Sequence, residues 1–269
     1  MNIDQLSNEY DILPTVRDIV SLIGESTGKE VDFELLINLD TDGIAKIARE
    51  RMPRHIIRIK ENSTARVNHI IAHECCHILR VMQARPSQRI VPSTNTWTTD
   101  KAFDALKSEL SAVPARARDE IFKLWVNGIV NQLVNLPVDV RIERRLYKNY
   151  PEFRDIQKKS VEIDVENCLL GLSDQVRNNT IESIFKNSNA MVYAYLKGVY
   201  GITGKDYRAE FEPYKDIARL GDLLFACLEH EDKGFTQDVE TINKWAELLD
   251  IEDWFTWIGF EEVPDSYYE

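Results

Sequence analysis

The five consecutive residues from His73 to His77 carry the most specific chemical signal in the sequence. They read His-Glu-Cys-Cys-His, so two histidines stand four positions apart with a glutamate between them. On a helix, residues four apart share one face, so His73 and His77 could offer two imidazole nitrogens to one metal ion. Zinc in a catalytic site takes three protein ligands and keeps one position for water, whose pKa falls toward neutrality. The pattern therefore predicts half of a zinc site, with Glu74 placed to accept the proton of that water.

The third ligand must come from another segment, and Asn135–Tyr147 supplies the best candidates. Asp139 and Glu143 stand four apart on a predicted helix. Either carboxylate could bind the metal while the other orients a ligand histidine, and the spacing does not choose between them. The alternative is a solvated charged helix, in which the two acids pair with neighbouring arginines: Arg141, Arg144 or Arg145.

Two further residues of the motif segment have candidate roles beside the metal. His69 lies one turn before His73. Because an α-helix has 3.6 residues per turn, three histidines spaced four apart do not all point in one direction, so we expect His69 to support or pack against the site rather than bind the metal. Cys76 could offer a thiolate, but a small apolar residue packed under the site is the preferred interpretation. The sequence has no C-x-x-C spacing, which argues against a disulfide framework and a structural zinc site.

The elements that must position these side chains follow from apolar spacing. The motif lies in Glu61–Met82, a segment with helical periodicity in which Asn62 and Ser63 provide an N-cap signal. A short amphipathic helix is expected at Thr15–Glu25. Two β-rich stretches separate these helices, Val31–Leu39 and Ile44–Lys60, and the second ends in a predicted strand at Arg54–Lys60.

Downstream of the motif the sequence predicts a loop and then helices only. The loop covers Ala84–Thr96, next to the expected site, because two prolines interrupt it and it shows little apolar pattern. Pro137 is expected to start or kink one of the helices that follow. The predicted helices are Asp100–Val113, Arg116–Val134, Asn135–Tyr147, Val165–Asn178, Ile181–Tyr200, Tyr207–His230, Gln237–Leu249 and Glu252–Ile258.

Composition narrows the class of protein. The chain has 269 residues and a formal net charge of −12, which argues against a nucleic-acid-binding protein because such proteins normally present a basic face. The first twenty residues do not resemble a signal peptide, and no apolar run approaches the length of a membrane span. We therefore expect a cytoplasmic protein that binds neither nucleic acid nor membrane.

The C-terminal segment is rich in aromatic and acidic residues. These residues could form a docking face for a protein partner, or they could cap a helical core. His230 is most simply a residue at the end of an apolar helix. The aromatic residues are Trp245, Trp254, Phe255, Trp257, Phe260, Tyr267 and Tyr268.

The motif and its surroundings resemble the zincin superfamily, specifically gluzincin-like metallopeptidases of the compact minigluzincin type. The resemblance covers about residues 15–150, where a helix and a small β-rich segment precede His73-Glu74-x-x-His77. The phrase from Asp139 to Glu143 is also similar to a D-x-R-I-E phrase in zincin-like regions of some proteins with von Willebrand A domains. The common gluzincin pattern places the ligand Glu before an Asp, whereas here Asp139 comes first, so the choice of ligand stays open.

The resemblance implies an α+β, mostly helical fold. A zincin-like core (residues 1–152) would contain a small sheet, the motif helix and a second ligand helix. The resemblance does not extend to residues 153–269, where the apolar spacing predicts a helical region packed on the core. It also implies Zn²⁺ as cofactor and hydrolysis of peptide or protein substrates, with Glu74 as general base. The alternative is a catalytically inactive or latent binding or regulatory module. In the latent form, the loop Ala84–Thr96 or the aromatic segment would cover the cleft.

Overall fold

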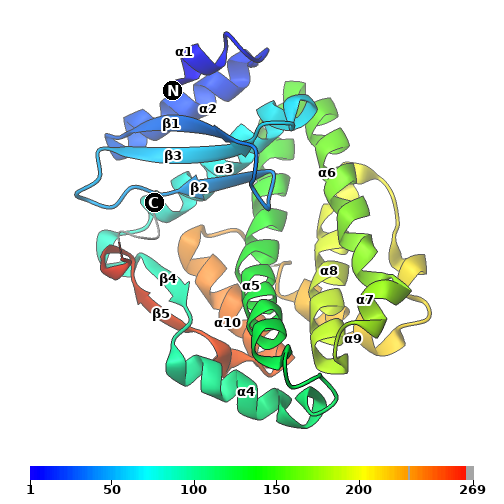
Figure 1. Cartoon of the computed structure of the whole chain (residues 1–269). Helices are drawn as coiled ribbons and strands as arrows, with labels where there is room; N and C mark the ends of the chain where they lie inside the picture. Colours follow the sequence, from blue (N-terminus) through cyan, green and yellow to red (C-terminus); the bar gives the residue numbers. More distant parts are fainter. Residues whose placement is uncertain (230, 265–269) are drawn as a thin grey trace.

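The protein is a mostly helical α+β structure, as predicted, and it contains two small sheets (Figure 1), of which the sequence predicts one. The computed structural model describes residues 1–229 and 231–264. The order of its helices and strands is α1 (Ile3–Leu6), α2 (Pro14–Thr27), β1 (Glu30–Leu36), β2 (Gly43–Lys46), β3 (Arg54–Lys60), α3 (Val67–Gln83), β4 (Ile90–Ser93), α4 (Thr96–Leu110), α5 (Arg118–Asn149), α6 (Arg154–Leu169), α7 (Asp174–Asn178), α8 (Glu182–Thr203), α9 (Lys215–Ala226), α10 (Phe235–Leu249) and β5 (Thr256–Gly259).

The first sheet has the strand order β1-β3-β2, with β3 in the centre. Buried and partly exposed residues alternate along β3, so His55, Ile57 and Ile59 face the core. β1 pairs with β3 in parallel, and β2 pairs with its other side antiparallel. This arrangement makes β2 an edge strand, and it lies against α3, the helix that carries the histidine motif (Figure 1).

α3 begins later than the sequence predicts. A 3-10 turn over Thr64–Arg66 precedes it, and its N-cap residue is Arg66, which makes no side-chain cap bond, so the predicted cap at Asn62 or Ser63 is wrong. Arg66 instead donates to Ser160 Oγ at 2.8 Å and pairs with Asp42 and Asp164. The guanidinium therefore connects the start of α3 to the turn before β2 and to α6.

α5 is one continuous helix of 32 residues where the sequence predicts two. Pro137 lies inside it and removes the bond that its N–H would have made to the carbonyl of Leu133. Packing along the helix offsets this loss, because α8 and α10 both contact α5. At the crossing with α8, a Cβ on Gly198 would stand 2.6 Å from both methyl carbons of Val140, so only glycine permits this close approach.

Two predictions about the C-terminal half and the loop after α3 are wrong for the same reason. The predicted loop Ala84–Thr96 contains strand β4, and the predicted helix Glu252–Ile258 is a 3-10 turn followed by strand β5. β4 and β5 pair antiparallel and form the second sheet. Such short strands show too little alternation to be recognised, and each gains its hydrogen bonds only from the other.

Of the other helices, α2, α4, α8 and α10 lie where the sequence predicts them and differ in their bounds, whereas α1 and most of α6 lie where it predicts no helix. A 3-10 turn divides the predicted helix Val165–Asn178 between α6 and α7, and α9 covers only part of Tyr207–His230. His230 and the terminal tyrosines Tyr267 and Tyr268 lie outside the described residues.

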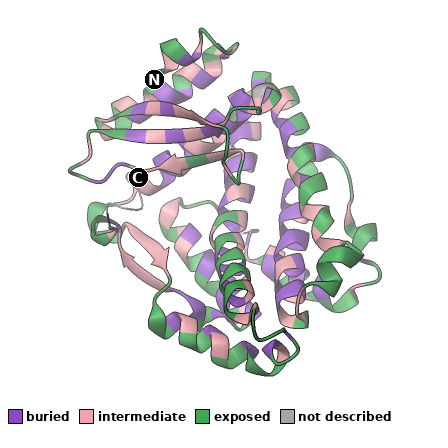
Figure 2. Cartoon of the chain, viewed as in Figure 1, coloured by how far each residue is buried: buried purple, intermediate pink, exposed green. Residues whose placement is uncertain are grey.

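The buried side chains form one cluster that includes residues from both 1–152 and 153–269. Buried residues concentrate where α3, α5 and α8 meet, while α4 and α7 carry much of the exposed surface (Figure 2). Within the described part of the chain, no helix is both long and apolar enough to cross a membrane.

We expect a pH dependence of stability from His55, which is fully buried on β3. Its Nδ1 accepts a hydrogen bond from the N–H of Ala48 at 3.0 Å, and burial, reinforced by the charge of Lys29, lowers the pKa of His55 to about 4. An unfolded histidine titrates near 6.5, so between these values the unfolded chain binds a proton that the folded protein does not. The contribution of neutral, buried His55 to the free energy of unfolding is therefore complete above pH 6.5 and is lost as the pH falls toward 4.

Urea unfolding of the wild type and His55→Gln between pH 7 and pH 4 measures this effect. The free energy of unfolding of the wild type should fall more steeply with decreasing pH, by up to about 1.4 kcal/mol per pH unit. The carboxylates that also titrate in this range are common to both proteins and cancel in the comparison. Parallel curves for the two proteins would contradict the role of His55.

Candidate metal centre

The structure brings His73, His77 and Asp139 together where α3 faces α5. His77 Nε2 lies 3.1 Å from His73 Nε2. Asp139 Oδ1 lies 3.2 Å from His77 Nε2 and 3.4 Å from His73 Nε2. The three residues form a group whose ligand atoms are close enough together to hold one metal ion.

Asp139 Oδ1 is the least satisfied atom of this group. It is buried, yet it accepts no hydrogen bond of ordinary geometry from the described residues, although both imidazoles are near. A buried carboxylate oxygen without a donor is costly, so such an atom calls for an explanation. A cation held between the three side chains would satisfy Asp139 Oδ1 and both nitrogens together.

Glu143 has a different position, one turn further along α5. Its Oε1 lies 2.7 Å from His73 Nδ1, the nitrogen that faces away from Asp139, and 3.0 Å from His69 Nε2. Gln157 on α6 donates to Glu143 Oε2 at 2.6 Å and to the Glu143 carbonyl at 2.7 Å. Glu143 is thus held by partners from two other helices, and its side chain is only 2% exposed.

His69, His73 and Glu143 form a second group that could hold an ion. In this group the carboxylate already has a partner for each oxygen, and the side chains of His69 and Glu143 are 3% and 2% exposed. The group of His73, His77 and Asp139 is more accessible, with side-chain exposures of 17%, 23% and 21%. The group of His73, His77 and Asp139 is therefore the better candidate for binding an ion, because its side chains are more exposed and Asp139 Oδ1 has no hydrogen-bond donor among the described residues.

The electrostatics of the cluster favour positive charge. Burial alone would lower the pKa of His73, but the carboxylates of Asp139 and Glu143 raise that pKa well above its ordinary value. Burial would likewise raise the pKa of Glu143 and of Asp139, but the neighbouring histidines hold both below their ordinary values. A metal ion would replace the proton of His73 as the charge that both carboxylates stabilise.

Glu74 projects from the same helix toward the edge strand. A Cβ on Gly43, the first residue of β2, would stand 3.3 Å from Glu74 Oε1 and 2.4 Å from Ile70 Cγ2. The strand can approach α3 this closely only because Gly43 has no side chain. Glu74 is therefore confined between its own helix and the start of β2.

A cavity of about 310 Å³ lies beside Glu74 and the candidate metal ligands, and its lining includes Glu74, His73, Asp139 and Gly43. Tyr195 of α8 also lines it and was not identified from the sequence. Burial, aided by nearby carboxylates, raises the pKa of Tyr195 well above its ordinary value, so its hydroxyl keeps its proton. Tyr195 stands among apolar residues of α8 at helical spacing, and no local pattern separates it from core residues.

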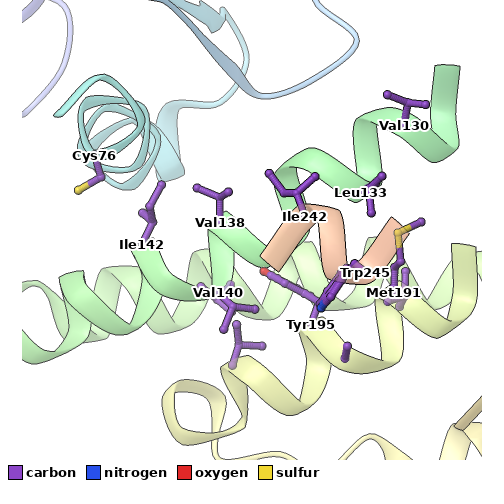
Figure 3. Close-up of a cluster of buried hydrophobic side chains, with 14 of the residues drawn as sticks. Cys76, Val130, Leu133, Val138, Val140, Ile142, Met191, Tyr195, Ile242 and Trp245 are labelled. Atoms are coloured by element: carbon purple, nitrogen blue, oxygen red, sulfur yellow. The ribbon is translucent and has the colours of Figure 1, made fainter. Parts of the chain in front are cut away.

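The other sequence predictions about this region can now be compared with the structure. Cys76 is buried and belongs to the hydrophobic cluster of the core (Figure 3), and burial raises the pKa of its thiol to about 11. Packing, rather than ligation, is thus the role that the structure gives it. His69 supports Glu143, as its position before His73 suggested.

The alternative of a solvated, self-paired helix at Asn135–Tyr147 is wrong. Arg141 donates to Asp238 at 2.8 Å and to Thr241 at 2.6 Å, both on α10. Arg144 donates to the carbonyl oxygen of Gly198 at 3.0 Å. Asp139 and Glu143 instead face the histidines of α3.

Comparison of the chain with protein-family models, with curated proteins and with solved structures finds no match in any of the three. The resemblance to zincins therefore rests on the motif residues themselves. A chemical interpretation of the centre has to be argued from the distances, burial and charges given above.

The close contact at Gly43 gives a testable prediction about the cavity wall. Gly43→Ala should destabilise the protein by about 1–3 kcal/mol, because the new methyl group overlaps Ile70 and crowds Glu74. Gly24→Ala is the matched control, since a Cβ there meets nothing within 4 Å and the residue lies inside α2. That control should be neutral or stabilising by up to about 1 kcal/mol. Chemical denaturation measures both, and equal effects would contradict the close approach of β2 to α3.

Proposed function

We propose that the protein is a zinc-dependent peptidase whose metal ligands are His73, His77 and Asp139. The observation that carries this proposal is the triangle of ligand atoms, with sides of 3.1, 3.2 and 3.4 Å. Nitrogen and oxygen ligands bind Zn²⁺ at about 2.0–2.2 Å, so in a tetrahedral site they stand about 3.3 Å from one another. Three protein ligands leave the fourth position for water, as in catalytic zinc sites.

Glu143 is proposed as the residue that orients His73. Ligand histidines usually donate their second ring N–H to a carboxylate or carbonyl, which fixes the ring and its tautomer. The 2.7 Å contact between His73 Nδ1 and Glu143 Oε1 fits this role, and it leaves His73 Nε2 to bind the metal. His69 and Gln157 hold Glu143 in turn.

The residues around the cavity supply the remaining chemistry. Zinc held by His73, His77 and Asp139 would lower the pKa of a water molecule and polarise the carbonyl of a substrate. Glu74 accepts the proton of the attacking water and transfers it to the leaving amine. Tyr195 remains protonated and lines the same cavity, so its hydroxyl can donate a hydrogen bond to the negatively charged oxygen that develops at the cleaved carbonyl.

The edge strand β2 supports a peptide as substrate. The N–H of Lys60 donates to the carbonyl oxygen of Asp42 at 2.9 Å, so by alternation the backbone groups of Gly43 and Ala45 point away from β3. An extended peptide can pair with such an edge through main-chain hydrogen bonds. Because Gly43 borders Glu74, a peptide on this edge would pass beside the catalytic base.

Metal content tests the ligand set. Elemental analysis after zinc reconstitution should find one zinc per chain in the wild type and in Glu74→Gln, and none in His77→Ala or Asp139→Ala. Glu143→Gln should keep the site but weaken zinc binding about 10- to 100-fold, the usual effect of losing a partner of a ligand histidine. Asp222→Ala, an exposed acid on α9, is the matched control and should not change zinc content. Retention of zinc by Asp139→Ala together with its loss in Glu143→Gln would reverse the assignment.

Activity tests the role of Glu74. The zinc-loaded wild type should cleave unstructured peptides, and Glu74→Gln should reduce kcat by about 10²–10⁴-fold while it retains zinc. The loss follows because the amide of Gln cannot accept the proton of the water. If the zinc-loaded wild type cleaves no member of a diverse peptide library, the alternative of an inactive or latent binding module is preferred.

A further inference from the structure

A second recess lies beside His77 and shares no lining residue with the larger cavity. Its volume is about 150 Å³, and its walls come from α3, β4, α5, α10 and β5. The larger cavity contains His73, Glu74 and Asp139, whereas His77 lines the recess. Because the Nε2 atoms of His73 and His77 are 3.1 Å apart, both hollows border the candidate metal centre.

The walls of the recess are mainly apolar and only partly buried. Aliphatic side chains line it from α3, β4, α5 and α10, and the indole of Trp257 closes it from β5. The indole N–H donates to Asn243 Oδ1 at 2.8 Å, so this polar group is already satisfied. The half-buried apolar residues of the lining include Val81, Ile90, Val91, Val134, Phe235, Val239 and Trp257.

The charged residues of the lining neutralise each other. Arg80 donates to Asp238 through Nε at 2.7 Å and through Nη2 at 2.6 Å, and it also binds Asp232. Asp238 accepts a further bond from Arg141 at 2.8 Å. The recess therefore offers no unpaired charge to a ligand from these residues, and its selectivity rests on apolar contact.

The wall formed by β4 and β5 is anchored to the motif helix. The guanidinium of Arg89 donates to the carbonyl oxygens of Met82 and Ala84 at the end of α3, at 2.8 and 3.0 Å. The carbonyl oxygen of Arg89 accepts a bond from the N–H of Phe260 at 2.9 Å, just after β5. Trp257 is thereby held at a fixed position relative to His77.

We propose that this recess is the specificity pocket for one uncharged apolar side chain of the substrate, next to the bond that is cleaved. The inference rests on the proposed function, because a substrate held at the metal centre is what brings the side chain there. An apolar cavity of 150 Å³ is large enough for a benzene molecule, so leucine, methionine or phenylalanine side chains fit its volume. A charged side chain would lose its hydration there without gaining a partner.

Hydroxamates that bind zinc test this without substrate turnover. Calorimetry with the zinc-loaded protein compares acetohydroxamate, the hydroxamate of 4-methylpentanoic acid and the monohydroxamate of succinic acid. The branched aliphatic probe should bind about 10- to 100-fold more tightly than acetohydroxamate, because its methyl groups leave water. The succinate probe should gain nothing over acetohydroxamate.

Variants locate the gain in affinity. Val81→Phe places a larger side chain in the recess. In this variant the dissociation constants of acetohydroxamate and of the aliphatic probe should be nearly equal, so that their ratio is close to one. Val176→Phe makes the same substitution at an exposed position on α7 and should keep the wild-type ratio. The comparison of probes on the wild type decides the matter even if Val81→Phe does not fold.

The failures of the two proposals are distinguishable. Binding of acetohydroxamate with no gain for the aliphatic probe would overturn the specificity pocket and leave the metal centre intact. Bound zinc that accepts neither hydroxamate would mean that no coordination position is open, which overturns the proposed function together with this inference.

Discussion

Arg80, Arg141 and Asp238, three buried charged side chains from distant parts of the sequence, form one network whose second positive charge is balanced by Asp232. They are 2%, 3% and 2% exposed and come from α3, α5 and α10. Removing one partner from such a set leaves an uncompensated buried charge, which costs several kcal/mol. The three helices therefore cannot slide or rotate independently. Because Arg80 lies three residues after His77 and Arg141 two residues after Asp139, the same constraint fixes the faces that carry the candidate ligands.

A second polar network acts on the other side of the centre. Glu143 connects His69 and His73 of α3 to Gln157 of α6, so the carboxylate is bound by two other helices. The geometry of the candidate ligands is thus supported by neighbouring groups, of which His69 and Glu143 also line the cavity. Close backbone approaches complete the arrangement, since Gly43 and Gly198 let β2 reach α3 and α8 reach α5.

The sequence predicts those features that depend on local spacing. The histidine pair follows from the helical repeat, and the bounds of β3, Arg54–Lys60, match the prediction because this short segment is rich in isoleucine. The choice between Asp139 and Glu143 depends on how far α5 is rotated against α3, which no spacing on either helix reveals. The pairing of β4 with β5 joins segments more than 160 positions apart, and the continuity of α5 through Pro137 depends on packing that outweighs a local penalty. Tyr195 reaches the cavity only through the tertiary fold.

The late position of Asp238 and β5 in the sequence has a consequence for biosynthesis. A ribosome releases His73, His77 and Asp139 long before it has made the residues that neutralise Arg80 and complete the wall beside His77. The nascent chain must therefore hold its histidine helix without its final partners, exposing apolar surface of α3 and α5. α10 and β5 can therefore complete the centre only after residues 235–259 have been made, later than the helices that carry the candidate ligands.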